Sequence, residues 1–450
     1  MDLPSLVLLA SIIVFSRLTE HFKIRLFCGS SVLRCLVVVN IFLFMGTASA
    51  ESLSFGKALT LVWQNHPDVR KAEAAVNASG YDKTAAYAGF FPYLQTDMVR
   101  GSQSKDDYVV RAVLPLWSGG QTLASVDAAK AAQNMALADL QRTRLQLALR
   151  LTDVYFSALA YKEQDGLWRQ YVDKLTNLHG MIQRRATSGV SPQADVMSIL
   201  SRLRQADASA ELNRASLAAA ETQLAALLGT TTESLFWPQN ALLTQDEIST
   251  ALARAMVEHP DLTFAAQTIT REQADTRMKR AGLSPELSLR YVKPFGSDSS
   301  NNTSETQIVL QYQSDNGLKA YQAWKSGEQR VDGARASLET ARLEVTSAIN
   351  LARAEIYAST AQLNYQSEAV LASDAVIDSF LRQFEAGRKS WLEVLNAQRE
   401  ALDTRMAQVQ QRRSLWQANT RLALHGLYWD NLVHDPEQPP TTIIAPEQTP

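Results

Sequence analysis

Residues 66–92 read HPDVRKAEAAVNASGYDKTAAYAGFFP, and residues 259–285 read HPDLTFAAQTITREQADTRMKRAGLSP. The two stretches share His-Pro-Asp at the start and Ala-Gly and Pro near the end, each match being 193 residues apart. Further matches at a spacing of 197 to 198 residues are Gly120 with Gly317, Gly189 with Gly387, and Asp195-Val196 with Glu393-Val394. Self-similarity at a fixed spacing indicates a repeated structural unit. We therefore predict a tandem internal repeat, with one copy over 51–240 and a second over 241–432.

Long helices make up most of each copy. Pro67 can open a first helix because its missing N–H costs nothing there, and we expect this helix to continue to Phe91. A much longer helix is expected over 120–187 and again over 318–386, because apolar residues recur there at every seventh position. The two series are Leu140, Leu147, Val154, Tyr161, Trp168, Leu175 and Ile182, then Ile349, Ile356, Leu363, Val370, Ile377 and Phe384. A seven-residue apolar repeat predicts coiled-coil packing.

The expected helix lengths agree with one another. At a rise of about 1.5 Å per residue, a helix over 120–187 spans roughly 100 Å. Helices over 67–91 and 191–228 together span about 94 Å. Two shorter helices stacked end to end thus match one long helix, with a break near 229–259. We expect the segment at this break to form a belt around a helical rod.

Two short strands follow the first helix of each copy, in the pairs 93–116 and 286–313. In the second pair, the residues Leu287, Leu289 and Tyr291 alternate with Ser288, Arg290 and Val292. Strands of about 9 to 11 residues with one apolar face suit a tilted bilayer crossing, although a soluble hairpin has the same pattern. Aromatic residues gather at the junction with the helices, as at a membrane interface: Phe90, Phe91, Tyr93 and Trp117. Four strands cannot close a barrel and lipid does not tolerate open edges, so three chains with twelve strands are expected.

Both termini read as segments outside this fold. An apolar run from Cys35 to Met45 precedes Thr47-Ala48-Ser49-Ala50, the small-residue pattern of a signal peptide, so we assign 1–50 to a signal cleaved after Ala50. Cys28 and Cys35 both lie within it, which would leave the mature chain without disulfides or thiolate metal sites. The Pro-rich tail over 433–450 is predicted to be disordered.

Composition argues against several function classes. The chain has 450 residues and a formal net charge of −2, which gives no electrostatic reason to expect a nucleic acid partner. No metal-ligand spacing occurs among the histidines after residue 50, which are His66, His179, His259, His425 and His434. No nucleophile motif, Walker loop or dinucleotide fingerprint is present. We therefore expect no enzyme, no catalytic residue, no metal and no cofactor.

The two expected helical turns carry the most specific signal. Residues 188–196 read SGVSPQADV, and residues 384–399 read FEAGRKSWLEVLNAQR. With the duplicated strand pairs and helix starts, they resemble the outer membrane efflux protein family, the TolC-like channel-tunnels. This resemblance implies a homotrimer in the outer membrane of a Gram-negative bacterium, with a 12-stranded transmembrane β-barrel continuous with a coiled-coil α-helical barrel in the periplasm. It also implies contact with outer-membrane lipid, a periplasmic membrane-fusion adaptor and an inner-membrane transporter.

The resemblance also assigns candidate site residues at the two tips. The periplasmic gate would contain Asp195, Phe384, Lys389, Glu393 and Asn396. A threefold ring of carboxylates there would attract cations, and mutual repulsion can raise their pKa values. Some relatives carry a second acid at the position of Asn396 and a hydrogen-bonding tyrosine at that of Phe384, so a two-ring, tyrosine-latched gate is in doubt. An ordinary solvated helix face is the alternative for Lys389 and Glu393.

The remaining candidates concern contacts with adaptor and cargo. The residues assigned to adaptor contact are Gly189, Val190, Ser191, Gly387, Arg388 and Ser390. Purely structural turns are an equal alternative, because glycine commonly ends a helix. Arg290 is assigned to the channel lumen, since it alternates with apolar residues in its strand.

Three functions remain open at this point. The second tip looks most like members that serve type I secretion of large adhesins, which favours an ABC-type transporter as partner. A multidrug efflux duct is the alternative within the same class, and the neighbouring genes would separate the two. A periplasmic coiled-coil adaptor is the alternative from another class, although adaptors usually carry one helical hairpin per chain.

Overall fold

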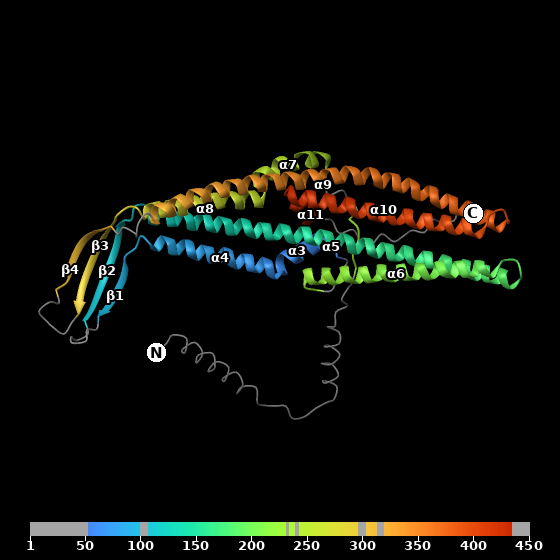
Figure 1. Ribbon diagram of the computed structural model, residues 1–450, viewed down its shortest axis with the longest axis horizontal. Coiled ribbons are helices and arrows are strands. Elements are labelled where there is room, and N and C mark those ends of the chain that lie inside the picture. The colour runs from blue at the N-terminus through green and yellow to red at the C-terminus, as the bar shows by residue number, and fades with distance from the viewer. Residues whose placement is uncertain are drawn as a thin grey trace, which may run out of the picture. The chain divides into compact units, whose positions relative to one another are not determined.

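The computed structural model describes residues 53–99, 107–230, 234–238, 243–295, 303–312 and 319–433. The predicted signal peptide with both cysteines, Arg100, Gly101, most of each strand turn, Gly317 and the predicted tail after Val433 lie outside these residues. The first half contains α3 (Phe55–Asn65), α4 (Pro67–Ala88), β1 (Tyr93–Val99), β2 (Asp107–Trp117), α5 (Gln121–Thr187) and α6 (Gln193–Leu228) (Figure 1). The second half contains α7 (Gln245–Glu258), α8 (Pro260–Ala281), β3 (Glu286–Phe295), β4 (Glu305–Gln311), α9 (Lys319–Glu385), α10 (Trp391–His425) and α11 (Trp429–Val433).

The described chain is mainly helical with one small antiparallel sheet, as predicted. Apart from the additional α11, the second half has the same order of elements as the first. The duplicated His-Pro-Asp motif begins α4 and α8 in the same way. The imidazole Nδ1 of each capping histidine accepts a hydrogen bond from the backbone N–H of the aspartate, at 3.2 Å in the first half and 3.3 Å in the second. Proline then occupies the first helical position, which needs no N–H donor.

Several boundaries differ from the predicted ones. The helix expected to reach Phe91 ends at Ala88, because Pro92 disfavours helical geometry in the residue before it and the chain turns over Gly89. α6 begins at Gln193 rather than Ser191, since the left-handed Gly189 and the extended Pro192 separate it from α5. The first strand is described to Val99, and β4 ends at Gln311. The small helices α3 and α11 were not predicted.

The sheet joins the two halves in the order β1-β2-β3-β4, with all pairs antiparallel. Its register places Leu287, Leu289 and Tyr291 on one face, where the apolar side chains of Leu94, Met98, Ile308 and Leu310 are also exposed. The opposite face carries Asp97, Arg111, Arg290 and Gln311. Of the described strands, β1 and β4 each have one neighbour, so each leaves one edge unpaired.

The helices continue the order of the strands. α4 packs on α5, α5 on α8, and α8 on α9, while α6 and α10 extend the layer beyond α4 and α8 (Figure 1). Heptad residues fill these contacts, since Leu175, Ile182 and Ile349 are each at most 1% exposed. No helix in the described ranges is both long enough and apolar enough to cross a membrane.

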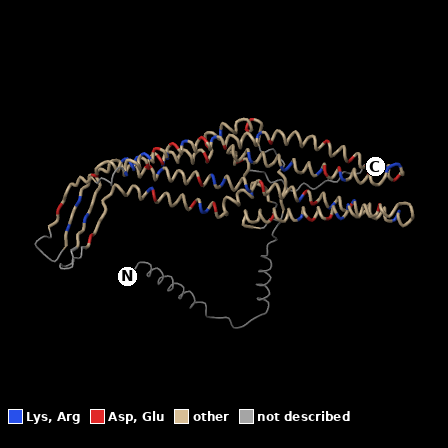
Figure 2. Tube along the Cα trace, viewed as in Figure 1, with Lys and Arg blue, Asp and Glu red and all other residues tan. Residues whose placement is uncertain are grey.

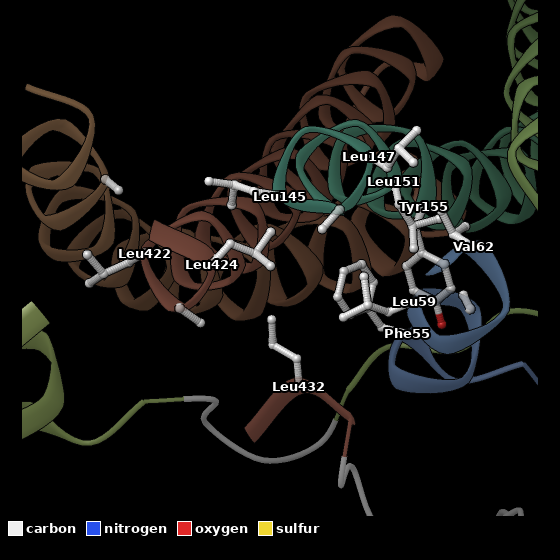
Figure 3. Close-up of a cluster of buried hydrophobic side chains, with 14 of the residues drawn as sticks. Phe55, Leu59, Val62, Leu145, Leu147, Leu151, Tyr155, Leu422, Leu424 and Leu432 are labelled. Carbon is white, nitrogen blue, oxygen red and sulfur yellow. The ribbon is translucent and has the colours of Figure 1, made fainter. Parts of the chain in front are cut away.

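The largest buried cluster lies where α3, α5, α10 and α11 meet (Figure 3). Phe55 of α3 contacts the rings of Tyr155 and Phe156 of α5 at centroid distances of 5.4 and 5.5 Å. The Tyr155 hydroxyl lies 2.9 Å from the carbonyl oxygen of Leu53 and 3.1 Å from that of Phe236. The segment between the two halves is therefore anchored to α5, and α7 packs against α9 and α10.

Candidate gate at the helical tips

Two helical tips lie at the end of the helices opposite the sheet (Figure 1). In the first tip, Gly189 adopts a φ of 75°, and the N–H of Val190 donates to the carbonyl of Arg185 at 2.9 Å. In the second, Gly387 adopts a φ of 73°, and the N–H of Arg388 donates to the carbonyl of Gln383 at 2.8 Å. A left-handed residue after the last turn lets the chain satisfy the final carbonyls and reverse direction. The predicted tip glycines thus have a structural function in both turns.

The second tip is closed by a capping box. The Ser390 hydroxyl accepts from the N–H of Glu393 at 3.3 Å, and a Glu393 carboxylate oxygen accepts from the N–H of Ser390 at 3.0 Å. This reciprocal pair satisfies two donors at the start of α10. Ser390, one of the predicted adaptor contacts, therefore stabilises its own helix.

Lys389 and Glu393 form an ion pair on the surface of the second tip. Lys389 Nζ lies 2.5 Å from Glu393 Oε1 and 4.4 Å from the centroid of the Phe380 ring. The hydrogen bond from Lys389, followed by those from Ser390, lowers the pKa of Glu393 to about 2. Within one chain this carboxylate is stabilised in its charged form, whereas repulsion in a ring of three would act in the opposite direction.

Asp195 occupies the corresponding position in the first tip, the third residue of α6. Ser191 stands where the second tip has Lys389, and Pro192 stands where it has Ser390. Accordingly, the N-cap of α6 makes no side-chain capping bond. Figure 2 shows basic residues at the α9–α10 turn, whereas residues 188–192 of the α5–α6 turn are uncharged and the basic residues before them, Arg184 and Arg185, belong to the last turn of α5. The two tips share a backbone geometry but differ in charge.

Phe384 belongs to the interior of the chain. It is 6% exposed and packs with Ile182, Val394 and Leu395 in a cluster shared by α5, α6, α9 and α10. The guanidinium of Arg185 lies over its ring at 5.5 Å, which connects the first tip to the second. Asn396, by contrast, is exposed one turn beyond Glu393. The structure therefore brings Lys389, Ser390 and Glu393 together and places Phe384 beneath them.

Two polar links near the tips were missed by the sequence analysis. Arg399 of α10 lies near Tyr171 of α5 and pairs with Asp403 at 3.0 Å, while burial raises the pKa of Tyr171. Arg405 of α10 pairs with Asp374 of α9 at 2.6 Å. Arg399 is far from Tyr171 in sequence, and Arg405 is on a different helix from Asp374. The only local signal was the aromatic heptad residue Trp168, which lies one turn before Tyr171.

Arg290 lies on the polar face of the sheet, where it was expected. Its Nη2 donates to Gln311 Oε1 of the neighbouring strand at 2.7 Å, while its buried Nε has no partner among the described residues. Arg111 forms an ion pair with Asp97 on the same face. One face of the sheet thus carries an ion pair and a hydrogen bond between strands, and the other is mostly apolar but includes Lys293.

Comparison with known proteins gives consistent matches over most of the chain. A model of the outer membrane efflux protein family matches residues 58–230 and 251–425. The chain is 21% identical to the outer membrane efflux protein BepC of Brucella suis biovar 1, over 80% of this chain and 82% of that protein. It is 24% identical to the cobalt-zinc-cadmium resistance protein CzcC of Cupriavidus metallidurans, over 70% of this chain and 76% of that protein. Its fold is similar to the Campylobacter jejuni CmeC outer membrane channel, with a TM-score of 0.73, 12% identity and coverage of 83% of this chain and 85% of that one.

Proposed function

The chain belongs to the outer membrane efflux protein family, and we propose that three copies of it form one duct across the outer membrane. Members of this family are channels rather than enzymes, located in the outer membrane with a helical periplasmic extension. The predictions of a channel, of an outer-membrane location and of no enzymatic activity are therefore confirmed. The periplasmic adaptor, our alternative from another class, is not retained because the chain belongs to a channel family.

The unpaired edges of the sheet support a trimer most strongly. β1 and β4 each pair on one side only, and the exposed apolar face between them includes Ile308 and Leu310, which are 72% and 66% exposed. Unpaired strand edges are too costly to keep in lipid, so the sheets must join edge to edge. Three copies of a four-stranded sheet give twelve strands, with the apolar face toward lipid and Arg290 toward the lumen.

For the cargo, we propose protein, with large adhesins as one class, which an ABC-type transporter and an adaptor deliver as in type I secretion. The support is the second tip, residues 384–399, which resembles members with that role. A duct for small toxic solutes is the second candidate, favoured by the name of the similar cobalt-zinc-cadmium resistance protein. In either case the gate would be at the two tips, with Asp195 and Glu393 in the bore. The tip residues available to an adaptor would be the half-buried Ser191 and the exposed Gly189, Val190, Gly387, Arg388 and Ser390.

Two measurements test this proposal. Native mass spectrometry of the detergent-solubilised protein should give three chains per particle, and a monomer from folded protein would contradict the trimer. Deletion of the gene should remove one or more large proteins from the culture medium without changing tolerance to metals or drugs. Unchanged secretion together with lost tolerance would instead establish the second candidate.

A further inference from the structure

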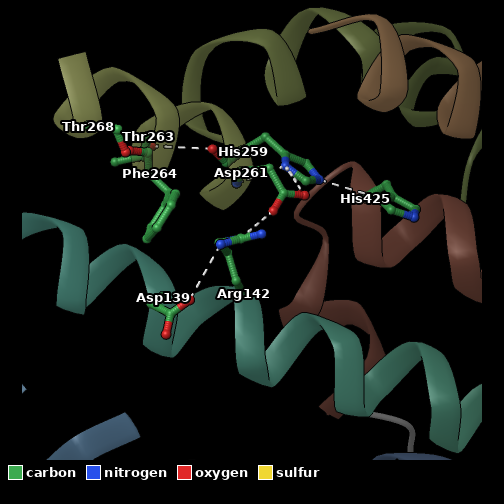
Figure 4. A network of polar contacts seen from close by, with 8 residues as sticks. All are labelled: Asp139, Arg142, His259, Asp261, Thr263, Phe264, Thr268 and His425. Carbon is green, nitrogen blue, oxygen red and sulfur yellow. Dashed lines mark hydrogen bonds and ion pairs between the residues drawn. The ribbon is translucent and has the colours of Figure 1, made fainter. Parts of the chain in front are cut away.

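A pair of histidines, His259 fully buried and His425 half-buried, lies far from the tips, where the second half begins. His259 ends α7 and caps α8, and its side chain is fully buried. His425 is the last residue of α10. The two rings stack with centroids 5.6 Å apart and planes within 10°, and His259 Nε2 lies 3.3 Å from His425 Nδ1 (Figure 4). The proposed transport function does not use this pair.

The hydrogen bonds determine where the protons are. His259 Nδ1 accepts from the backbone N–H of Asp261, so it carries no proton. A neutral His259 must then carry its proton on Nε2, which donates to His425 Nδ1. A proton added to His425 Nδ1 would place two N–H donors against each other. A proton added to His259 Nδ1 would oppose the N–H of Asp261. The pair therefore fits together only when both rings are neutral.

The surrounding charges do not compensate for a proton. Asp261 of α8 lies 3.5 Å from His259 Nδ1, but Arg142 of α5 already pairs with it at 2.6 Å (Figure 4). Arg142 also contacts Asp139 of α5 at 3.4 Å. Arg421 of α10 adds positive charge one turn before His425. Its guanidinium is engaged by Asp153 of α5 at 2.7 Å and by Glu355 of α9 at 3.7 Å. Glu258 of α7, the residue before His259, is exposed.

The first half has the same helix start without the pair. His66 caps α4 and contacts Asp68 as His259 contacts Asp261. The residue that ends α6, however, is Leu228, which is 1% exposed. His425 thus occupies a position where the first half has a buried leucine. The first half therefore serves as an internal comparison, because its capping histidine has no second histidine at the equivalent helix end.

We propose that His259 and His425 form a proton-sensitive latch, which fastens the end of α10 to the start of α8 at neutral pH and releases it in acid. Burial lowers the pKa of His425 from 6.5 to about 4, and burial also lowers the pKa of His259. A buried neutral histidine binds its proton more readily when the joint is open. The stability of the closed joint is therefore complete above the ordinary histidine pKa of 6.5 and declines as the pH falls toward 4.

Hydrogen exchange on the full-length mature protein in detergent tests this latch. Peptides covering 260–268 and 420–428 report on the latch, and the equivalent peptides over 67–75 and 223–230 report on the first half. After correction for intrinsic exchange rates, protection at the latch should fall on the order of tenfold more than in the first half between about pH 7.5 and about pH 5. Hydrogen exchange does not depend on transport. The experiment therefore tests the latch separately from the proposed duct.

Two variants separate the latch from a general effect of acid. His425→Leu copies the first half and should reduce the extra acid response to the part that His259 contributes by itself. If it fails to fold, His425→Asn replaces it, since an amide oxygen accepts the His259 Nε2–H bond and does not titrate. His66→Asn is the matched control and should leave the response unchanged. An equal loss of protection in both halves, or an acid response as large in the folded His425 variant as in the wild type, would overturn the proposal.

Discussion

Among single residues, Lys389 has the most testable effect on the proposed gate. It pairs with Glu393, whose pKa is lowered to about 2, so this carboxylate stays ionised and neutralised across the physiological range. Any stability that the pair contributes is present above the ordinary pKa of 4.5 and is lost as the pH falls toward 2. Asp195, at the matching place in the first tip, has no such lysine.

Removing the lysine should therefore change ion selectivity. In Lys389→Ala, each chain loses one positive charge beside Glu393, and the channel should prefer cations more strongly than the wild type. The reversal potential in a salt gradient across a planar bilayer measures this preference. Arg382→Ala, which removes an exposed positive charge from the last turn of α9, is the control. Equal reversal potentials for wild type and Lys389→Ala would show that the Lys389–Glu393 pair does not line the bore.

At the scale of elements, the tips depend on left-handed glycine. Gly387→Ala should destabilise the protein by about 1 kcal/mol, because a Cβ at a φ of 73° crowds the backbone. Gly333→Ala provides the matched control, since Gly333 lies inside α9 with open space around it and should gain up to about 1 kcal/mol. Thermal unfolding of both variants gives the comparison. A stabilised Gly387→Ala variant would show that the turn does not require this conformation.

The sheet allows a paired test on one strand. Ile308→Lys places a charge on the apolar face of β4 and should cost about 2–4 kcal/mol if that face meets the bilayer core. Gln307→Lys, one residue earlier, faces the polar side and should be tolerated. The fraction of protein recovered in outer membranes measures both effects. Equal recovery of the two variants would contradict the assignment of the faces.

Which elements could be predicted depended on how local their signals are. The long helices α5 and α9 begin and end within one residue of the expected bounds, because heptad spacing is visible along one segment. The strands were found from their alternation, but α3 and α11 were missed, since such short helices depend on packing against Tyr155 and its neighbours.

The contacts at the site were less predictable, because most of them join residues that are far apart in sequence. The gate residues came from a resemblance, which gave their positions in sequence but not their contacts. The ion pair of Lys389 with Glu393 spans four residues and could have been read from the capping pattern. The packing of Arg185 on Phe384 and the pairing of His259 with His425 could not, because the partners are 199 and 166 residues apart.

For the whole molecule, we propose that three chains form one continuous duct. The sheet supplies unpaired edges and an apolar face, and the helices continue from it in the same order to two tips. A four-stranded sheet cannot close into a barrel by itself, so the duct requires the sheets of several chains.

Single-channel recording of the purified protein in planar lipid bilayers tests this claim most directly. We expect small, cation-preferring openings, which become larger or less selective in Glu393→Ala. If Glu393→Ala forms the same openings as the wild type, the protein is a channel but Glu393 does not belong to its gate. Folded protein that forms no channels and fractionates away from outer membranes would contradict the account.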